Sequence, residues 1–197
     1  TALKVKALQN VFTGKLFLEV RKEKAGLGTA YIHGFKWCIA KGYDYIFEMD
    51  ADFSHDPKDV LKLYNACHIE GADMAIGSRY ATGVNVVNWP MSRVLMSYWA
   101  SKYVRLITGM KIHDTTAGFI CYKRHVLEAI DLDAVKFIGY AFQIEMKFKT
   151  YLKKFKIVEV PVIFTDRTRG ESKLSSGIIS EAIFGVISMK LKSLFKK

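Results

Sequence analysis

The chain has 197 residues, of which half are apolar and a quarter are charged, and its formal net charge is +11. This length suits one domain with a sizeable core, and the composition excludes a disordered or collagen-like chain. The basic excess predicts an anionic partner, such as a phosphorylated substrate, lipid headgroups or nucleic acid. Three widely spaced cysteines without a C-x-x-C pair disfavour a disulfide scaffold and structural zinc, and they fit a reducing compartment.

Apolar runs and turn residues predict strands that alternate with helices. We expect strands at residues 16–20, 45–49, 74–78, 119–122 and 156–164. We expect helices at residues 29–40, 57–70, 92–108, 124–130 and 140–152. Strand–helix–strand units of these lengths need crossover connections, which predicts an α/β fold with a mostly parallel sheet flanked by helices. The last strand is expected near the edge of the sheet because it contains Pro161.

A basic amphipathic helix is expected at residues 177–197, after a single domain at residues 1–176. Residues 147–197 hold 12 Lys or Arg against 4 Asp or Glu. The longest apolar stretch, 177–189, is shorter than the roughly 18 residues that a membrane span needs. We expect this helix to lie on an anionic membrane surface, with packing on the protein body or on a partner as the alternative. Nucleic acid is a weaker expectation, because no nucleic-acid-binding signature is present.

Two carboxylates, Asp50 and Asp52, directly follow the second predicted strand and are separated by one alanine. Ligands of open α/β sheets bind beyond the carboxyl ends of the strands. Two neighbouring acids repel each other unless a cation lies between them, and Mg²⁺ or Mn²⁺ prefers such oxygen ligands, shared with a diphosphate. Ser54 can add another oxygen. We expect Asp56 to cap the next helix and His55 to be structural.

Basic residues are predicted to gather around this acid pair. Arg79 follows the third predicted strand and should lie on the same edge of the sheet. Arg93 begins the next helix, and Arg167 and Lys173 lie in the polar loop 165–176. Each residue alone also fits a surface charge. Together they suit two separate phosphates, one on a leaving group and one on an acceptor.

A short glycine-containing turn, Gly26-Leu27-Gly28-Thr29, opens the first predicted helix. It fits either a phosphate cradle or an ordinary tight turn. The third glycine of the dinucleotide fingerprint is missing from it.

Five sequence blocks occur in a fixed order: Gly26–Ala30, Phe47–His55, Gly77–Tyr80, Asp114–Phe119 and Asp166–Leu174. Together they closely resemble the polyprenol-phosphate (dolichyl-phosphate) mannosyltransferases, which are inverting enzymes of the GT-A fold in glycosyltransferase family two. The resemblance covers nearly the whole chain and is more specific than any single block.

The resemblance implies a metal site and its neighbouring acids. Asp50 and Asp52, with Ser54, are implied to hold Mg²⁺ or Mn²⁺ on the diphosphate of a nucleotide sugar. Asp114 is implied to contact the sugar or to act as a base, and Glu145 to lie near the sugar.

The resemblance also implies which residues bind phosphate. Arg79 and Arg93 are implied to bind phosphate groups at the catalytic centre. Arg167 and Lys173 are implied to engage donor or acceptor phosphate from their loop, and Gly28 is a further candidate for substrate contact.

One departure from the family pattern concerns the start of the chain. Family members begin with a strand and turn, and then a second strand that ends in Asp-Asp, and these segments bind the nucleobase and ribose. Thr1 and Ala2 resemble the residues just after that second strand. The domain at 1–176 is therefore expected to lack its first nucleotide-binding strands.

The implied reaction is inverting transfer of mannose from GDP-mannose to a polyprenol monophosphate at the cytoplasmic face of a membrane. The expected partners are the nucleotide sugar, the polyprenol phosphate lipid and the membrane surface, without nucleic acid. One alternative is a UDP-sugar donor carrying glucose or an N-acetylhexosamine. Another is a non-catalytic, membrane-bound interaction subunit that needs neither a metal nor the acid pair.

Overall fold

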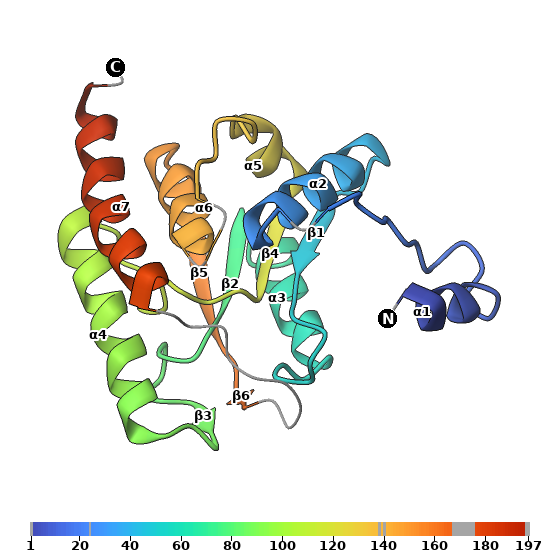
Figure 1. The fold of residues 1–197 in the computed structure, drawn as a ribbon, viewed down its shortest axis with the longest axis horizontal. Helices are drawn as coiled ribbons and strands as arrows, with labels where there is room; N and C mark the ends of the chain where they lie inside the picture. The colour runs from blue at the N-terminus through green and yellow to red at the C-terminus, as the bar shows by residue number, and fades with distance from the viewer. Residues whose placement is uncertain (1, 24, 138, 140, 167–175, 196–197) are drawn as a thin grey trace.

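The computed structural model describes the whole chain except residues 1, 24, 138, 140, 167–175 and 196–197 (Figure 1). Its helices are α1 Ala2–Gln9, α2 Leu27–Ala40, α3 Asp59–His68, α4 Met91–Thr108, α5 Arg124–Ala129, α6 Ala141–Leu152 and α7 Ser176–Phe195. Its strands are β1 Tyr45–Glu48, β2 Met74–Ser78, β3 Val86–Val87, β4 Ile120–Lys123, β5 Ile157–Pro161 and β6 Phe164–Thr165.

The main sheet has four strands in the order β1-β4-β2-β5. Strand β2 pairs in parallel with β5, whereas β4 runs antiparallel to both β1 and β2. Three strands therefore point the same way and only β4 is reversed, which confirms the expected α/β class. Because of this reversal, the start of β4 lies at the same edge of the sheet as the carboxyl ends of β1, β2 and β5. The site described below lies at that edge.

The core is divided between the two faces of the sheet because successive side chains of a strand point to opposite sides. Along β2, Met74 and Ile76 belong to a cluster beneath α2, α4 and α6, whereas Ala75 faces α3. Leu63 and Cys67 of α3 complete the second cluster and are fully buried. The result is a three-layer arrangement with α3 on one face and the remaining large helices on the other (Figure 1).

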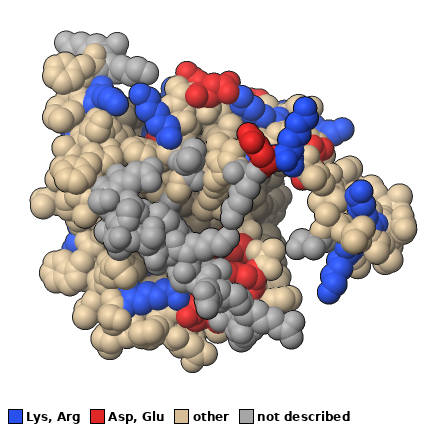
Figure 2. Space-filling view, in the orientation of Figure 1, with Lys and Arg blue, Asp and Glu red and all other residues tan. Residues whose placement is uncertain are grey.

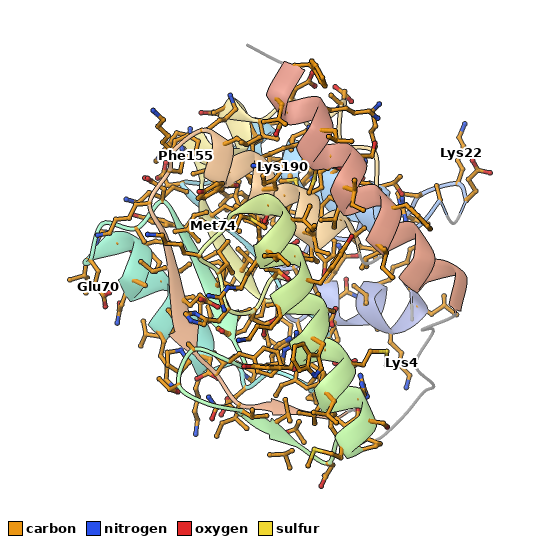
Figure 3. The ribbon with its side chains drawn as sticks, turned by 90° about the vertical axis from the view of Figure 1, so that its left-hand side faces the viewer. Lys4, Lys22, Glu70, Met74, Phe155 and Lys190 are labelled. Carbon is orange, nitrogen blue, oxygen red and sulfur yellow. The ribbon has the colours of Figure 1, made fainter. Side chains whose placement is uncertain are left out.

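Helix α7 packs along α4 and α6, and Figure 3 shows α4 and α7 side by side. Val186 is buried in the core, and Lys190 Nζ donates to the carbonyl of Thr108 at 3.2 Å, at the end of α4. The side chains of Phe184 and Phe195 remain exposed. One face of α7 is thus docked on the body while apolar side chains remain on its surface. None of the helices, within the described part of the chain, has the length and hydropathy to cross a membrane.

Two local predictions differ from the structure. Residues 16–20 form no strand, because the described chain places no other strand beside them to complete a hydrogen-bonded ladder. Helix α3 begins at Asp59, two residues later than Pro57. Asp56 Oδ1 instead accepts the backbone N–H of Lys58 at 2.9 Å, so Asp56 stabilises the turn that leads into the helix.

Candidate active site

The candidate site lies where four segments of the chain reach one edge of the sheet. Asp50 and Asp52 follow β1, Arg79 follows β2, Asp114 precedes β4, and Asp166 follows β6. Figure 2 shows acidic side chains near the middle of the face in view, with basic side chains beside them on the left. The antiparallel β4 is what delivers Asp114 to an edge that the other strands reach with their carboxyl ends.

The acid pair lies in a tight loop whose conformation is fixed by its own hydrogen bonds. Asp52 Oδ1 accepts the backbone N–H of Ser54 at 3.1 Å, and the Ser54 carbonyl accepts the N–H of Thr165 at 3.1 Å. Phe53, between them, has a φ of 64° and is 91% exposed. A left-handed backbone is costly for a bulky residue and is found mostly where a functional loop requires it. Asp50 and Asp52 are half-buried, so their carboxylates lie at the surface of the site.

The polar side chains of Tyr31, Glu48 and Tyr122 lie next to the acid pair. The Tyr31 hydroxyl is hydrogen-bonded to the Asp50 side chain, and burial together with the charges of Glu48 and Asp50 raises the pKa of Tyr31. Tyr122 Oη donates to Glu48 Oε1 at 3.2 Å. Burial raises the pKa of Glu48 to about 8, although the nearby Lys147 opposes that shift. Tyr31 is therefore protonated, and its hydroxyl donates the hydrogen bond that orients the Asp50 carboxylate.

Arg79 and Asp114 form a fully paired ion pair inside the site. The backbone N–H and Nε of Arg79 donate to Asp114 Oδ2 at 2.9 and 2.7 Å, and Nη2 donates to Oδ1 at 2.7 Å. Asp114 is completely buried. Burial alone would raise its pKa, but the Arg79 guanidinium outweighs that effect and holds the pKa below its usual value. Asp114 is thus an ionised partner of Arg79, with both carboxylate oxygens engaged.

Glu159 on β5 holds the turn that carries Asp114. Its Oε1 accepts the Ser78 hydroxyl and the backbone N–H of Asp114, each at 2.8 Å. Its Oε2 accepts the backbone N–H of His113 at 2.7 Å and lies 2.8 Å from His113 Nδ1. One carboxylate therefore ties β5 and β2 to the turn before β4.

Arg93 lies in the first turn of α4 and is held by an aromatic ring and a carboxylate. Its Cζ lies 4.1 Å from the centre of the Trp89 ring, and its Nη1 donates to Asp166 Oδ1 at 2.8 Å. The Arg79 Cζ lies 5.2 Å from the same Trp89 ring. The predicted convergence of Arg79 and Arg93 is therefore seen in the structure, with a tryptophan between them that the sequence analysis did not single out.

His55 packs as a core side chain beside this cluster. Its ring lies 4.9 Å from that of Phe119 and 5.1 Å from that of Phe164. Burial and the neighbouring Arg79 lower the pKa of His55 to about 4, so the ring is neutral at pH 7. This surrounding agrees with the structural role expected of His55.

Two other predicted residues, Gly28 on α2 and Glu145 on α6, lie against the segment 132–137. Gly28 lines a cavity of about 200 Å³ between the start of α2 and the segment 132–137. Glu145 Oε2 accepts the backbone N–H groups of Lys136 and Phe137 at 2.9 and 3.0 Å, so this carboxylate braces that segment. Arg167 and Lys173 lie outside the described residues.

The residues around the acid pair fit a hard divalent cation. The Ser54 Oγ is buried and has no hydrogen-bond partner among the residues that the structure describes, which is the state expected of an oxygen that completes its bonding with an ion, a water or a ligand. Two carboxylates and a hydroxyl are oxygen donors of the kind that Mg²⁺ and Mn²⁺ prefer. The described residues contain no group of three or more His, Cys, Asp or Glu that could enclose a metal by themselves.

Comparison with known proteins identifies the family. Residues 1–131 match the family described as glycosyl transferase family 2. The chain is 49% identical over 166 residues to polyprenol monophosphomannose synthase of Mycolicibacterium smegmatis, and this match covers 84% of the chain and 62% of the relative. It is 47% identical to undecaprenyl-phosphate mannosyltransferase of Micrococcus luteus over 84% of the chain and 68% of that protein. The chain belongs to glycosyl transferase family 2, as its sequence blocks indicated.

A more distant relative is also a mannosyltransferase by name, and solved structures share the fold. Dolichol-phosphate mannosyltransferase of Pyrococcus furiosus is 39% identical over 82% of the chain, which spans only 44% of that protein. The fold matches crystal structures of glucosyl-3-phosphoglycerate synthase from Mycobacterium tuberculosis, with a TM-score of 0.58 at 16% identity, over 89% of the chain and 55% of the synthase. That synthase was crystallised with Mn²⁺ or with Mg²⁺, together with uridine diphosphate.

Three residues of the site were missed by the sequence analysis: Tyr31, Trp89 and Glu159. Tyr31 lies in a helix whose apolar face explains it as a core residue, and Glu159 lies in an edge strand. Trp89 had a local signal, since a tryptophan in a loop four residues before an arginine is a candidate partner for that cation.

Proposed function

We propose that this chain is the catalytic part of a mannosyltransferase that moves mannose from GDP-mannose to a polyprenol monophosphate, with inversion at the sugar and with the help of Mg²⁺ or Mn²⁺. One observation carries the proposal. A loop with two carboxylates and a buried, unpartnered hydroxyl lies at the same sheet edge as two arginines held against one tryptophan. The names of the curated relatives support the choice of sugar and of lipid acceptor.

The acid pair is proposed to bind the diphosphate of the donor through a divalent cation. Asp50, Asp52 and Ser54 would hold the divalent cation, which supplies positive charge to the leaving diphosphate when it is bound. Tyr31 keeps the Asp50 carboxylate oriented, and the Ser54 N–H does the same for Asp52. These contacts are made before any substrate arrives, so the loop needs little rearrangement on binding.

The two arginines allow the acceptor phosphate and the donor diphosphate to come close together. A phosphate oxygen of the acceptor forms the new bond to C1 of mannose, while the bond from C1 to the diphosphate breaks and its electron pair leaves with GDP. The acceptor phosphate is already ionised, so no general base is required. Arg93 and Arg79 offset the repulsion between the two phosphates.

Asp114 acts in this scheme through Arg79. Its two oxygens are engaged by the guanidinium and backbone of Arg79, so we assign it a positioning role in place of the base or sugar contact that the family resemblance implied. Glu159 supports the same turn from β5.

Membrane contact is proposed for the outer surface of α4 and α7. Trp99 and Leu106 of α4 and Phe184 and Phe195 of α7 are exposed. A surface of this kind suits docking at the cytoplasmic face of a membrane, where the lipid tail stays while its phosphate enters the site.

The test is transfer measured in the complete encoded polypeptide with labelled GDP-mannose, polyprenol phosphate and Mn²⁺ or Mg²⁺. Asp52→Ala should abolish metal-dependent transfer and Mn²⁺ binding while the circular dichroism stays unchanged. Lys62→Ala, on an exposed part of α3, is the control and should keep full activity. Retained transfer in Asp52→Ala would refute the metal assignment. Transfer from UDP-glucose or a UDP-N-acetylhexosamine in place of GDP-mannose would overturn the choice of donor, and no transfer from any donor would favour an interaction subunit.

A further inference from the structure

Trp89 lies between the two arginines of the site. Its ring centre is 4.1 Å from the Arg93 Cζ and 5.2 Å from the Arg79 Cζ. The ring is fixed by an edge-on contact with Phe164 at 5.2 Å between centres. Two guanidinium groups that touch one indole are close neighbours, and like charges at such a separation repel each other. A carboxylate beside each arginine offsets this repulsion, and the shared indole sets where the two cations lie.

Each arginine also has its own carboxylate, but the two ion pairs differ. Asp114 is completely buried and occupies the Nε and Nη2 side of Arg79. Asp166 pairs with Arg93 and its side chain is 25% exposed. A carboxylate neutralises the guanidinium that it binds and competes with phosphate for the same N–H groups. An indole does neither, because a cation–π contact uses the face of the guanidinium and leaves its N–H edges available.

We infer that Trp89 is a positioning residue for phosphate binding, which keeps the Arg93 guanidinium beside the Arg79–Asp114 pair, where it can receive a phosphate or diphosphate group. When an anion enters, Arg93 can exchange Asp166 for a phosphate oxygen and keep its contact with the indole. Trp89 thus maintains the position of the cation while its hydrogen-bond partner changes. This inference rests on the phosphate-binding role of the arginines in the proposed function.

The indole also provides a reporter. The Trp89 Nε1–H is buried and has no acceptor among the described residues. Its resonance is therefore sensitive to any ligand or guanidinium that moves over the ring. The chain contains three tryptophans, and replacing each one in turn assigns the three indole N–H signals.

The experiment measures binding of inorganic pyrophosphate to the purified protein by calorimetry. Removal of the ring in Trp89→Leu should weaken pyrophosphate binding about tenfold, because a desolvated cation–π contact contributes on that scale. Trp89→Phe keeps an aromatic face and should lie within about threefold of the wild type. The matched control is Trp37→Leu, since Trp37 also carries a cation over its ring, Lys41 at 5.7 Å, but lies at the far end of α2. It should bind pyrophosphate as the wild type does.

A double-mutant cycle separates positioning from general damage. Trp89→Leu combined with Arg93→Ala should bind no more weakly than Arg93→Ala alone, because the tryptophan acts through that arginine. Independent, multiplying effects would overturn the inference, as would wild-type affinity in Trp89→Leu. If Trp89→Leu fails to fold, the indole N–H resonances of the wild type test the inference instead. Pyrophosphate should then shift the indole N–H resonance of Trp89 and not that of Trp37. If the Trp89 resonance stays in place, the inference is wrong.

The same data distinguish this inference from the proposed function. If the wild type binds pyrophosphate and Arg93→Ala loses it while Trp89→Leu does not, only the role of Trp89 is wrong. If the wild type does not bind pyrophosphate, or if Arg93→Ala leaves binding intact, the phosphate role of the arginine pair fails and this inference fails with it.

Discussion

Arg79 and Asp114 are 35 positions apart in the sequence and are joined by three hydrogen bonds of 2.7–2.9 Å in the interior of the protein. The pair exists because β4 runs opposite to β2, so that the turn before β4 meets the end of β2. A buried charge is tolerated only while its partner is present. The fold therefore brings the two residues together, and the stability of the fold in turn depends on both of them.

Removal of Asp114 should be among the most destabilising single changes at the site. We expect Asp114→Ala to lower the free energy of unfolding by about 3–5 kcal/mol, because it leaves the Arg79 guanidinium buried without a partner. Asp166→Ala, at a partly exposed ion pair, should change it by less than about 1 kcal/mol. Urea denaturation at pH 7 measures both. A loss below 1 kcal/mol in Asp114→Ala would show that water reaches Arg79.

Glu159 should be sensitive even to an isosteric change. Glu159→Gln removes one acceptor oxygen from a carboxylate that accepts hydrogen bonds from Ser78, His113 and Asp114. We expect a loss of about 1–3 kcal/mol in the free energy of unfolding, since a buried backbone donor is left unpaired. Glu128→Gln, on the exposed side of α5, should leave stability within about 0.5 kcal/mol of the wild type. Equal melting curves for the two variants would contradict this reading of Glu159.

Two glycines should respond to alanine in opposite directions. A Cβ on Gly77 would lie 2.9 Å from Phe119 Cδ1 and 3.3 Å from the Phe119 carbonyl oxygen, in a fully buried part of the sheet. Gly77→Ala should therefore destabilise the protein by about 1–3 kcal/mol. Gly34 lies within α2 and a Cβ there meets nothing within 4 Å, so Gly34→Ala should stabilise it by about 0.5–1 kcal/mol. Thermal melting of both variants checks the two signs.

His55 should make the metal-free protein sensitive to mild acid. Its pKa is lowered from 6.5 to about 4 in the folded state, so between these pH values the unfolded chain binds a proton that the folded chain does not. Stability should therefore fall as the pH is lowered from 6.5 to 4, by up to about 3 kcal/mol. His55→Leu should remove this part of the pH dependence, whereas His33→Gln, at an exposed position on α2, should keep it. Urea denaturation in the presence of a chelator at pH 4.5 and pH 7 gives the comparison. An equal change in the free energy of unfolding between these pH values for wild type and His55→Leu would refute the prediction.

The order of helices and strands could be predicted because each long element carries its own periodic pattern. The segment 91–108 and the strand 74–78 are examples in which apolar spacing and flanking Pro or Gly residues were sufficient. The segment 16–20 has the composition of a strand, but a strand also needs a neighbour, and that information is not local. The reversal of β4 is of the same kind, since β1, β2 and β4 have similar apolar sequences.

The candidate site was predictable where residue type and strand ends coincide, and not where the partner is distant in sequence. Asp50, Asp52 and Arg79 follow strands directly, so their common edge follows from the topology. That Asp114 binds Arg79, and does not stand free beside a substrate, depends on the register of β4 against β2. That Glu145 braces the segment 136–137 depends on a loop conformation that no periodicity describes.

Helix α4 forms a straight connection between the candidate site and α7. It is 18 residues long, about 27 Å, with Arg93 in its first turn and Thr108 at its last residue. Lys190 and the carbonyl of Ile183, both in α7, are bonded to Thr108 and to the Tyr103 hydroxyl. A rigid rod that is fastened at one end transmits displacement to the other. Under the proposed function, a surface that bears on α7 would therefore displace the end of α4 that carries Arg93.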